Sequence, residues 1–222
     1  LDDERSMAES APINPYWMGA TEVNWKTFGP FLDNASSKSV VSEQQAALIR
    51  RAIQSAPPGQ RDRVAVGFIS LSTARAFCDW INRAAATADP PRHYRLPTER
   101  EWEYACRAGN AGRFCYGNNA RYARFFANCN GNVAPVHIVA QRMPNAYGLF
   151  DMHGGLWEWC DTPYPPELVT EPELAKRELW VYRGGAYYSP AVRCRSTQRN
   201  RGQADSWTDY HGFRLVMELL EL

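Results

Sequence analysis

The sequence predicts an α+β protein whose helices lie in the first half and whose short strands and long loops lie in the second half. Two observations lead to this prediction. Before Gly109, apolar residues recur at helical spacing behind good capping residues. After Gly109, glycine, asparagine, proline and aromatic residues replace that spacing. No repeat or linker divides the 222 residues, so we predict a single domain over residues 1–222.

The chain begins with a predicted strand over residues 17–23 and a predicted short helix over residues 25–31, both from the spacing of apolar residues. A longer helix is predicted over residues 42–56. Ser42 suits its N-cap, and Pro57 marks its end.

Two further helices follow. A short apolar strand after Val64 leads into a helix for which we predict Ser72 as the cap. Its inward-facing positions are Ala76, Phe77, Trp80 and Ile81. The next helix starts at Thr98, where Glu101 lies three residues later, as a capping box requires, and Gly109 ends it. The strand candidates of the second half are residues 136–140, 157–161, 179–185 and 211–217.

Charge and hydropathy restrict the classes of partner. The net charge is +1, so no electrostatic argument favours nucleic acid. No apolar run approaches the roughly 18 residues of a membrane-spanning helix, so we predict no membrane insertion. Because no signal segment is seen, a cytoplasmic location is the default expectation. The chain begins with Leu1, which leaves open that it is part of a longer protein.

The six cysteines form no Cys-x-x-Cys pair, so a structural zinc site is not expected. We predict that most are reduced core residues. They are Cys78, Cys106, Cys115, Cys129, Cys160 and Cys194.

Several segments in order resemble the formylglycine-generating enzyme, or sulfatase-modifying factor, family. They include "WMGATEVNWKTF", "YRLPTEREWEYACRAG", "PNAYGLFDMHGGLWEWCD", "VYRGGAY", "CRSTQRN" and "GFRLV". The resemblance extends from Tyr16 to Val216 and implies a variant of the C-type lectin fold, with few regular strands and long loops.

The enzymes of this family carry two cysteines after the Gly-Gly pair, which bind copper and engage the substrate thiol. Paired soft sulfurs suit Cu(I). Here no cysteine lies between Gly185 and Cys194, so we expect no copper and no catalytic residues. Cys194 lies between Arg193 and Arg195, which could lower its pKa, but we interpret it as a packing residue.

A non-catalytic branch of the family contains the variable proteins of diversity-generating retroelements. In these proteins, asparagine codons are mutagenised at their adenines in the stretch between Arg-Gly-Gly and Gly-Phe-Arg, here Arg183 to Arg214. Most polar and aromatic residues of that stretch can arise from an AAC codon. Trp207 cannot, and is either an exposed anchor or a core residue. The predicted ligand-binding residues are Tyr187, Tyr188, Ser189, Pro190, Val192, Asn200, Gly202, Ser206, Trp207, Thr208, Asp209, Tyr210 and His211.

The resemblance also implies a structural calcium ion, because "FDMHGGLWEW" corresponds to a calcium loop of the family. The implied ligands are Asp151, the carbonyls of Gly154 and Leu156, and Glu158. Ligation by oxygen alone suits Ca²⁺. The alternative for Glu158 is an ion pair with an arginine. A second calcium site of the family would use Asn128 and the Cys129 carbonyl, but the sequence after them is shortened.

The sequence therefore predicts a non-catalytic domain that binds an unknown protein or other macromolecular ligand through a tyrosine- and serine-rich surface. Two alternatives stay open. The chain could be an oxidoreductase of the same family with an altered site, or an accessory domain of a larger signalling or peptidase protein.

Overall fold

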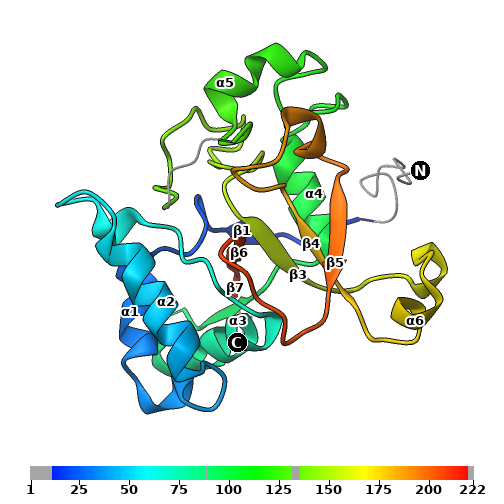
Figure 1. The fold of residues 1–222 in the computed structure, drawn as a ribbon. Helices are drawn as coiled ribbons and strands as arrows, with labels where there is room; N and C mark the ends of the chain where they lie inside the picture. Colours follow the sequence, from blue (N-terminus) through cyan, green and yellow to red (C-terminus); the bar gives the residue numbers. More distant parts are fainter. Residues whose placement is uncertain (1–11, 89, 132–135, 220–222) are drawn as a thin grey trace.

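The computed structural model describes residues 12–88, 90–131 and 136–219, which form two β-sheets with helices around them (Figure 1). The α-helices are α1 Trp25–Leu32, α2 Glu43–Gln54, α3 Leu71–Ala85, α4 Glu99–Arg107, α5 Ala123–Phe126 and α6 Pro172–Ala175. The strands are β1 Trp17–Met18, β2 Arg92–Arg95, β3 Trp157–Pro163, β4 Trp180–Arg183, β5 Arg199–Gly202, β6 His211–Gly212 and β7 Val216–Leu219. The predicted α+β class is confirmed. Within the described ranges, no helix combines the length and hydropathy needed to cross a membrane.

The strands form one sheet in the order β1-β7-β2 and a second sheet in the order β5-β4-β3-β6. Neighbouring strands are antiparallel except β3 and β6, which run parallel. Strand β7 lies between β1 and β2, so early and late parts of the chain build the first sheet together. In Figure 1 the second sheet lies at the centre of the molecule, with α1, α2 and α3 toward one end and α5 at the other.

Side-chain caps begin the three longest helices. Ser42 and Thr98 cap α2 and α4 as predicted, the latter with a complete capping box. The predicted cap of α3 is wrong, because Ser70 accepts the hydrogen bond from the third residue of that helix. Ser72 lies within the first turn, where its hydroxyl donates to Asp205 Oδ1 at 2.6 Å.

The strand predictions succeed where a strand is buried. Candidates at residues 157–161 and 179–185 correspond to β3 and β4, whose first residues are largely buried. Residues 136–140 make only an isolated bridge, from Ile138 to Val64, and form no strand. Strands β2 and β5 were missed because they are edge strands with the polar sequences RHYR and RNRG, which show no apolar alternation.

Aromatic side chains from α1, α3 and the segment before β7 lie at the centre of the main core, among aliphatic residues. Phe28, Phe31, Phe77 and Phe213 are at most 1% exposed, and their ring centroids lie 5.3 to 6.4 Å apart in the contacting pairs. Edge-to-face packing of this kind adds to the burial of apolar area. A second core, between α4 and the central sheet, contains Trp102.

Arg214, which follows β6, is fully buried and makes a two-point ion pair with Glu158 of β3. Its Nε donates to Glu158 Oε2 at 2.6 Å, and its Nη2 donates to Oε1 at 2.7 Å. The same guanidinium donates to the carbonyls of Gly19 and Phe150. Trp102 Nε1 donates to Glu158 at 2.8 Å, so this pair links α4, β3 and the residue that follows β1.

Arg183, at the end of β4, is the second fully buried arginine. It donates to Glu103 of α4, and its Nε lies 3.4 Å from Glu99 Oε1. Arg183 and Arg214 are the two ends of the segment in which we predict ligand binding. Both ends are therefore fixed to buried carboxylates.

We predict that Arg214→Met lowers the free energy of unfolding by about 3–5 kcal/mol, because it leaves the buried Glu158 carboxylate without its partner. Urea denaturation measures this loss. The matched control is Arg50→Met, which removes an ion pair with the exposed Asp33 and should cost less than about 1 kcal/mol. Equal losses in the two variants would contradict the structural role of the buried pair.

Candidate functional site

The main chain of residues 204–211 follows a path set by hydrogen bonds to other parts of the fold. N–H groups of the segment before α3, of the first turn of α3 and of β3 donate to its carbonyls. The donor and acceptor pairs are Ser72 with Ala204, Phe68 with Thr208, Ile69 with His211, and Trp157 with Tyr210. At Gly67 a Cβ would lie 2.2 Å from the Asp209 carbonyl oxygen, so this close approach requires glycine.

Four predicted residues form one group, which we call the tyrosine cluster: Tyr187, Tyr188, Asp209 and Tyr210. The ring centroid of Tyr188 lies 5.5 Å from that of Tyr187 and 5.0 Å from that of Tyr210. The Tyr187 hydroxyl donates to Asp209 Oδ2 at 2.8 Å. Partial burial and this hydrogen bond raise the pKa of Tyr187 to about 12, so the hydroxyl stays protonated at neutral pH.

The thirteen predicted binding residues differ in exposure. The exposed ones are Tyr188, Pro190, Val192, Asn200 and Asp209. The half-buried ones are Tyr187, Gly202, Ser206, Trp207, Thr208 and Tyr210. Ser189 and His211 are buried. Eleven of the thirteen therefore reach the surface at least in part, and two lie beneath it.

Ser189 and His211 are not surface residues, which corrects their assignment to the binding surface. The Ser189 hydroxyl accepts a hydrogen bond from the Ala186 N–H and so closes a turn. The His211 ring lies among Trp159 and Tyr182, with centroids 5.1 and 4.7 Å away. Since neighbours on an extended strand alternate faces, burial of His211 leaves the preceding residue facing outward.

Trp207 is half-buried and packs edge-to-face on Phe68 with ring centroids 6.1 Å apart. It also lines a cavity of about 450 Å³ together with Asp205 and Ser72. One face of the Trp207 ring is therefore packed and the other is open to a cavity. The residue is neither a fully exposed anchor nor a fully buried core residue.

Glu158 does not fit the predicted calcium set of Asp151, Gly154, Leu156 and Glu158. Both of its carboxylate oxygens accept hydrogen bonds from Arg214, so a cation bound there would lie beside a guanidinium. The structure contains the alternative, an ion pair with an arginine. The second calcium site would use Asn128 and the Cys129 carbonyl. Residues 132–135, in the shortened stretch after them, lie outside the described residues.

Asp151 belongs instead to a buried group that sequence reasoning missed. Glu22, His137 and Asp151 present ligand atoms that all lie within 4.8 Å of one another. His137 Nε2 is 3.0 Å from Glu22 Oε2 and 3.9 Å from Asp151 Oδ2. Burial lowers the pKa of His137, but the charge of Glu22 outweighs it and raises the pKa to about 9. The only sequence signal was the presence of His137 among four histidines.

Comparison with known proteins decides the family. Residues 2–219 match the model of the sulfatase-modifying factor enzyme 1-like domain.

The chain belongs to this family.

Among its relatives, a Bos taurus protein named inactive C-alpha-formylglycine-generating enzyme 2 is 31% identical over 183 residues, which cover 72% of this chain and 54% of the relative. The formylglycine-generating enzyme of Bos taurus is 26% identical over 271 residues, which cover 98% of this chain and 70% of the enzyme. Serine/threonine-protein kinase pkn1 of Chlamydia pneumoniae is 31% identical over 171 residues, which cover 73% of this chain but only 25% of the kinase. The chain thus spans about half the length of the inactive relative and a quarter of the kinase.

Solved structures confirm the fold predicted from the resemblance, a C-type lectin fold of the formylglycine-generating-enzyme type. Treponema denticola variable protein 1 superposes with a TM-score of 0.69 at 22% identity, covering 90% of this chain and 84% of that protein. PvdO from Pseudomonas aeruginosa superposes with a TM-score of 0.66 at 22% identity, covering 98% and 88%.

The thiol groups of this member of the sulfatase-modifying factor family are mostly inaccessible. Cys194 is fully buried, and a Cβ at Gly185 would lie 2.5 Å from its Sγ. Contact with the Cys129 thiol and burial raise the pKa of Cys194. Cys129 is itself buried in the same small apolar cluster, and its hydrogen bond with the Cys194 thiol lowers its pKa. An enclosed thiol whose pKa is raised, such as that of Cys194, is a poor nucleophile.

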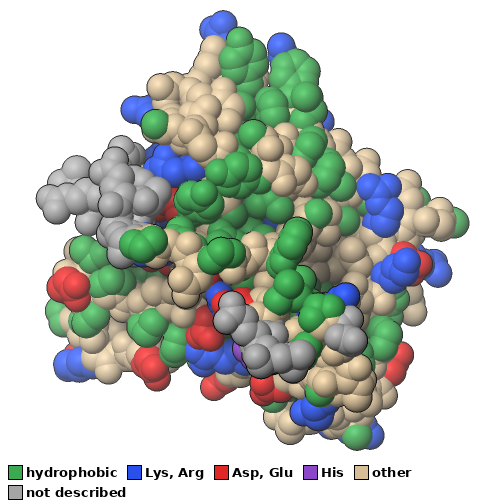
Figure 2. Space-filling view, turned by 180° about the vertical axis from the view of Figure 1, so that it is seen from behind, with side chains coloured by type: hydrophobic (Ala, Val, Ile, Leu, Met, Phe, Trp, Pro, Cys, Tyr) green, Lys and Arg blue, Asp and Glu red, His purple; other side chains and the backbone are tan. Residues whose placement is uncertain are grey.

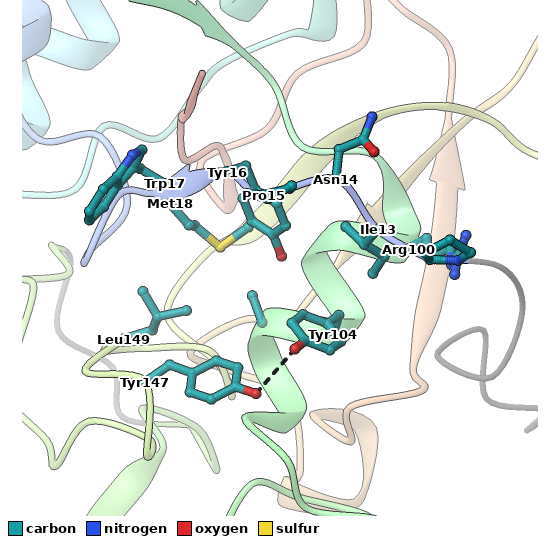
Figure 3. Close-up of a pocket in the computed structure, with 12 residues that line it drawn as sticks. Ile13, Asn14, Pro15, Tyr16, Trp17, Met18, Arg100, Tyr104, Tyr147 and Leu149 are labelled. Atoms are coloured by element: carbon teal, nitrogen blue, oxygen red, sulfur yellow. Dashed lines mark hydrogen bonds between the residues drawn. The ribbon is translucent and has the colours of Figure 1, made fainter. Parts of the chain in front are cut away.

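A pocket of about 650 Å³ lies elsewhere, between the start of the described chain and α4 (Figure 3). Tyr16, Tyr104 and Tyr147 line it, and the Tyr147 hydroxyl donates to that of Tyr104 at 3.4 Å. The pocket shares no residue with the tyrosine cluster. Hydrophobic side chains also gather over the middle and the upper end of the face seen from behind in Figure 2.

We predict that His211 makes the protein sensitive to acid. Burial lowers the pKa of His211 to about 4, below the ordinary value of about 6.5. As the pH falls, the unfolded chain therefore binds a proton at this histidine before the folded chain does. The free energy of unfolding is highest above about pH 6.5 and decreases by up to about 3 kcal/mol as the pH falls to about 4. Melting temperatures between pH 7 and pH 4 test this. The decrease in melting temperature should be smaller in His211→Asn. The control His93→Asn should show the same decrease as the wild type.

Proposed function

We propose that this chain is a non-catalytic ligand-binding domain whose binding surface lies between Arg183 and Arg214. The observation that carries the proposal is the tyrosine cluster, in which three tyrosine rings and one carboxylate lie together at the surface. Tyrosine supplies a large contact area at a low cost in conformational entropy, and its hydroxyl can donate or accept.

The chemistry of the surface favours a protein or another macromolecular ligand. Exposed Pro190 and Val192 add apolar contact area beside the tyrosines along the chain, while Asn200 and Asp209 add hydrogen-bonding groups. This mixture of aromatic, small apolar and polar groups is typical of protein-binding loops. A net charge of +1 gives no support to nucleic acid.

The buried thiols support a non-catalytic role. No cysteine lies between Gly185 and Cys194, and Cys194 itself is enclosed. The runner-up, an oxidoreductase with an altered site, requires copper-dependent oxidation of a cysteine-containing peptide by the purified chain. Oxidation that Cys194→Ser abolishes would establish the runner-up and overturn the non-catalytic proposal.

We further propose that the surface positions are varied by a diversity-generating retroelement. The fold shared with Treponema denticola variable protein 1 supports this. A neighbouring reverse transcriptase gene and a near-identical template repeat with adenines at the surface codons would bear it out, and their absence would refute it.

A second candidate is an accessory domain within a longer protein. The match to serine/threonine-protein kinase pkn1 favours it, because the matching region covers only a quarter of that kinase. The binding surface proposed above is compatible with this arrangement, in which the domain would recruit the ligand for the rest of the protein. The length of the full gene product tests it.

We predict that substitutions at exposed positions of the surface leave stability almost unchanged. Tyr188→Ser, Asn200→Ser and Asp209→Asn should each change the free energy of unfolding by less than about 0.5 kcal/mol, as is usual for surface sites. Ser189→Asn should cost about 1–3 kcal/mol, because it disrupts a buried hydrogen bond. Urea denaturation compares the variants. If the exposed variants lose as much stability as the buried one, the tyrosine cluster is structural and the binding proposal fails.

A further inference from the structure

We propose that Glu22, His137 and Asp151 bind a divalent transition-metal cation in a buried site beneath the tyrosine cluster. This site shares only Asp151 with the calcium set implied by the family resemblance, and it contains an imidazole, which calcium does not favour. One nitrogen and carboxylate oxygens suit Zn²⁺ and cations of similar character.

The distances fit such an ion. The gaps of 3.0 Å and 3.9 Å from His137 Nε2 to the two carboxylates bracket the separation of ligand atoms around a tetrahedral ion. For bonds of about 2.1 Å that separation is about 3.4 Å. The three side chains are at most 2% exposed. Glu22 is 115 positions from His137 in sequence, so the fold, and not local geometry, brings it to the other two ligands.

One carboxylate oxygen of Asp151 accepts no hydrogen bond from the described residues. Its Oδ2 accepts from the Ala140 N–H at 2.6 Å. Its Oδ1 is buried and has no hydrogen-bond partner within the described part of the chain. A buried carboxylate oxygen without a partner costs free energy, and a bound cation would satisfy it.

The charges of the region also call for a cation. Glu22, Asp151 and Glu158 are buried carboxylates, and Arg214 already pairs with Glu158. A protonated His137 would compensate only one of the two remaining negative charges. A divalent cation with neutral His137 would compensate both. On binding, the ion replaces the proton between His137 Nε2 and Glu22, and that proton is released to solvent.

The surroundings hold the ligands in position. The Asn128 side-chain amide nitrogen lies 2.8 Å from His137 Nδ1. With a metal ion on Nε2, Nδ1 carries the proton, and the Asn128 amide turns by 180° so that its oxygen accepts from Nδ1–H. The Leu156 N–H donates to Glu22 Oε1 at 3.1 Å. At Gly155 a Cβ would lie 2.5 Å from Glu22 Oε1 and 2.7 Å from His137 Nε2. Glycine at this position keeps open the space that the ligand atoms use.

A cavity of about 30 Å³ lies next to His137 on the side of the binding surface. Tyr187 and Asp209 of the tyrosine cluster line the same cavity. It has room for one water molecule.

Titration of the purified full chain after removal of metals by a chelator tests the proposal. Zn²⁺, Co²⁺ and Ca²⁺ are the probes, with stoichiometry from elemental analysis and affinity from calorimetry. We expect one Zn²⁺ or Co²⁺ per chain and much weaker Ca²⁺ binding. Asp151→Asn and His137→Gln should raise the Kd at least about tenfold. The control His93→Gln, in a half-buried histidine of β2, should leave the Kd unchanged.

The absorption spectrum of the Co²⁺ form separates this site from the cysteines. Nitrogen and oxygen ligands give no thiolate charge-transfer band, so the expected spectrum lacks one. Such a band, a lack of Zn²⁺ and Co²⁺ uptake by the folded wild-type chain, or uptake unchanged in both variants would each overturn the proposal. The wild-type spectrum decides even if a variant fails to fold, as circular dichroism would show.

Discussion

The buried ion pair between Arg214 and Glu158 connects parts of the fold that no single sheet joins. Arg214 donates to both oxygens of Glu158 and to the carbonyls of Gly19 and Phe150. Desolvating two charges is costly, and such a pair stabilises a fold only when further hydrogen bonds satisfy it. Here Trp102 also donates to Glu158, so α4 and β3 meet at this carboxylate, and Arg214 joins them to Gly19, directly after β1. The position of the predicted binding segment depends on this junction.

The same ion pair explains why the implied calcium set does not fit. A carboxylate in the interior needs a positive charge close by, and either a metal ion or a guanidinium can supply it. At Glu158 the guanidinium of Arg214 supplies that charge. At Glu22 and Asp151, the described part of the structure offers only His137 within reach. Neighbouring carboxylates in one fold can therefore be neutralised in different ways.

Sequence patterns predicted the elements whose signals are local. The capping box at Thr98 and the strands β3 and β4 are examples, because a cap spans four residues and these strands carry aromatic and β-branched residues. The cap of α3 was displaced to Ser70, since two serines two residues apart both satisfy the pattern and only tertiary contacts select one.

The candidate site was harder to predict, because exposure and clustering depend on the fold. His211 is a polar residue in a polar segment, which is typical of the surface. The pleat of the strand nevertheless directs its ring among those of Trp159 and Tyr182. The group of Glu22, His137 and Asp151 could not be found from spacing, because Glu22 and His137 are 115 positions apart. Neither residue belongs to a recognisable metal-binding motif.

The close approach of Gly67 to the Asp209 carbonyl has a consequence for how such a surface could evolve new specificity. Antibody loops change both their length and their backbone shape. Here the path of residues 204–211 is tied to the segment before α3 and to β3, so new specificity can come only from exchanging side chains on an unchanging frame. Variants of such a surface would differ in the chemistry of their side chains more than in the shape of their backbone. The surface would also be preorganised, because little backbone order is left to acquire when a ligand arrives.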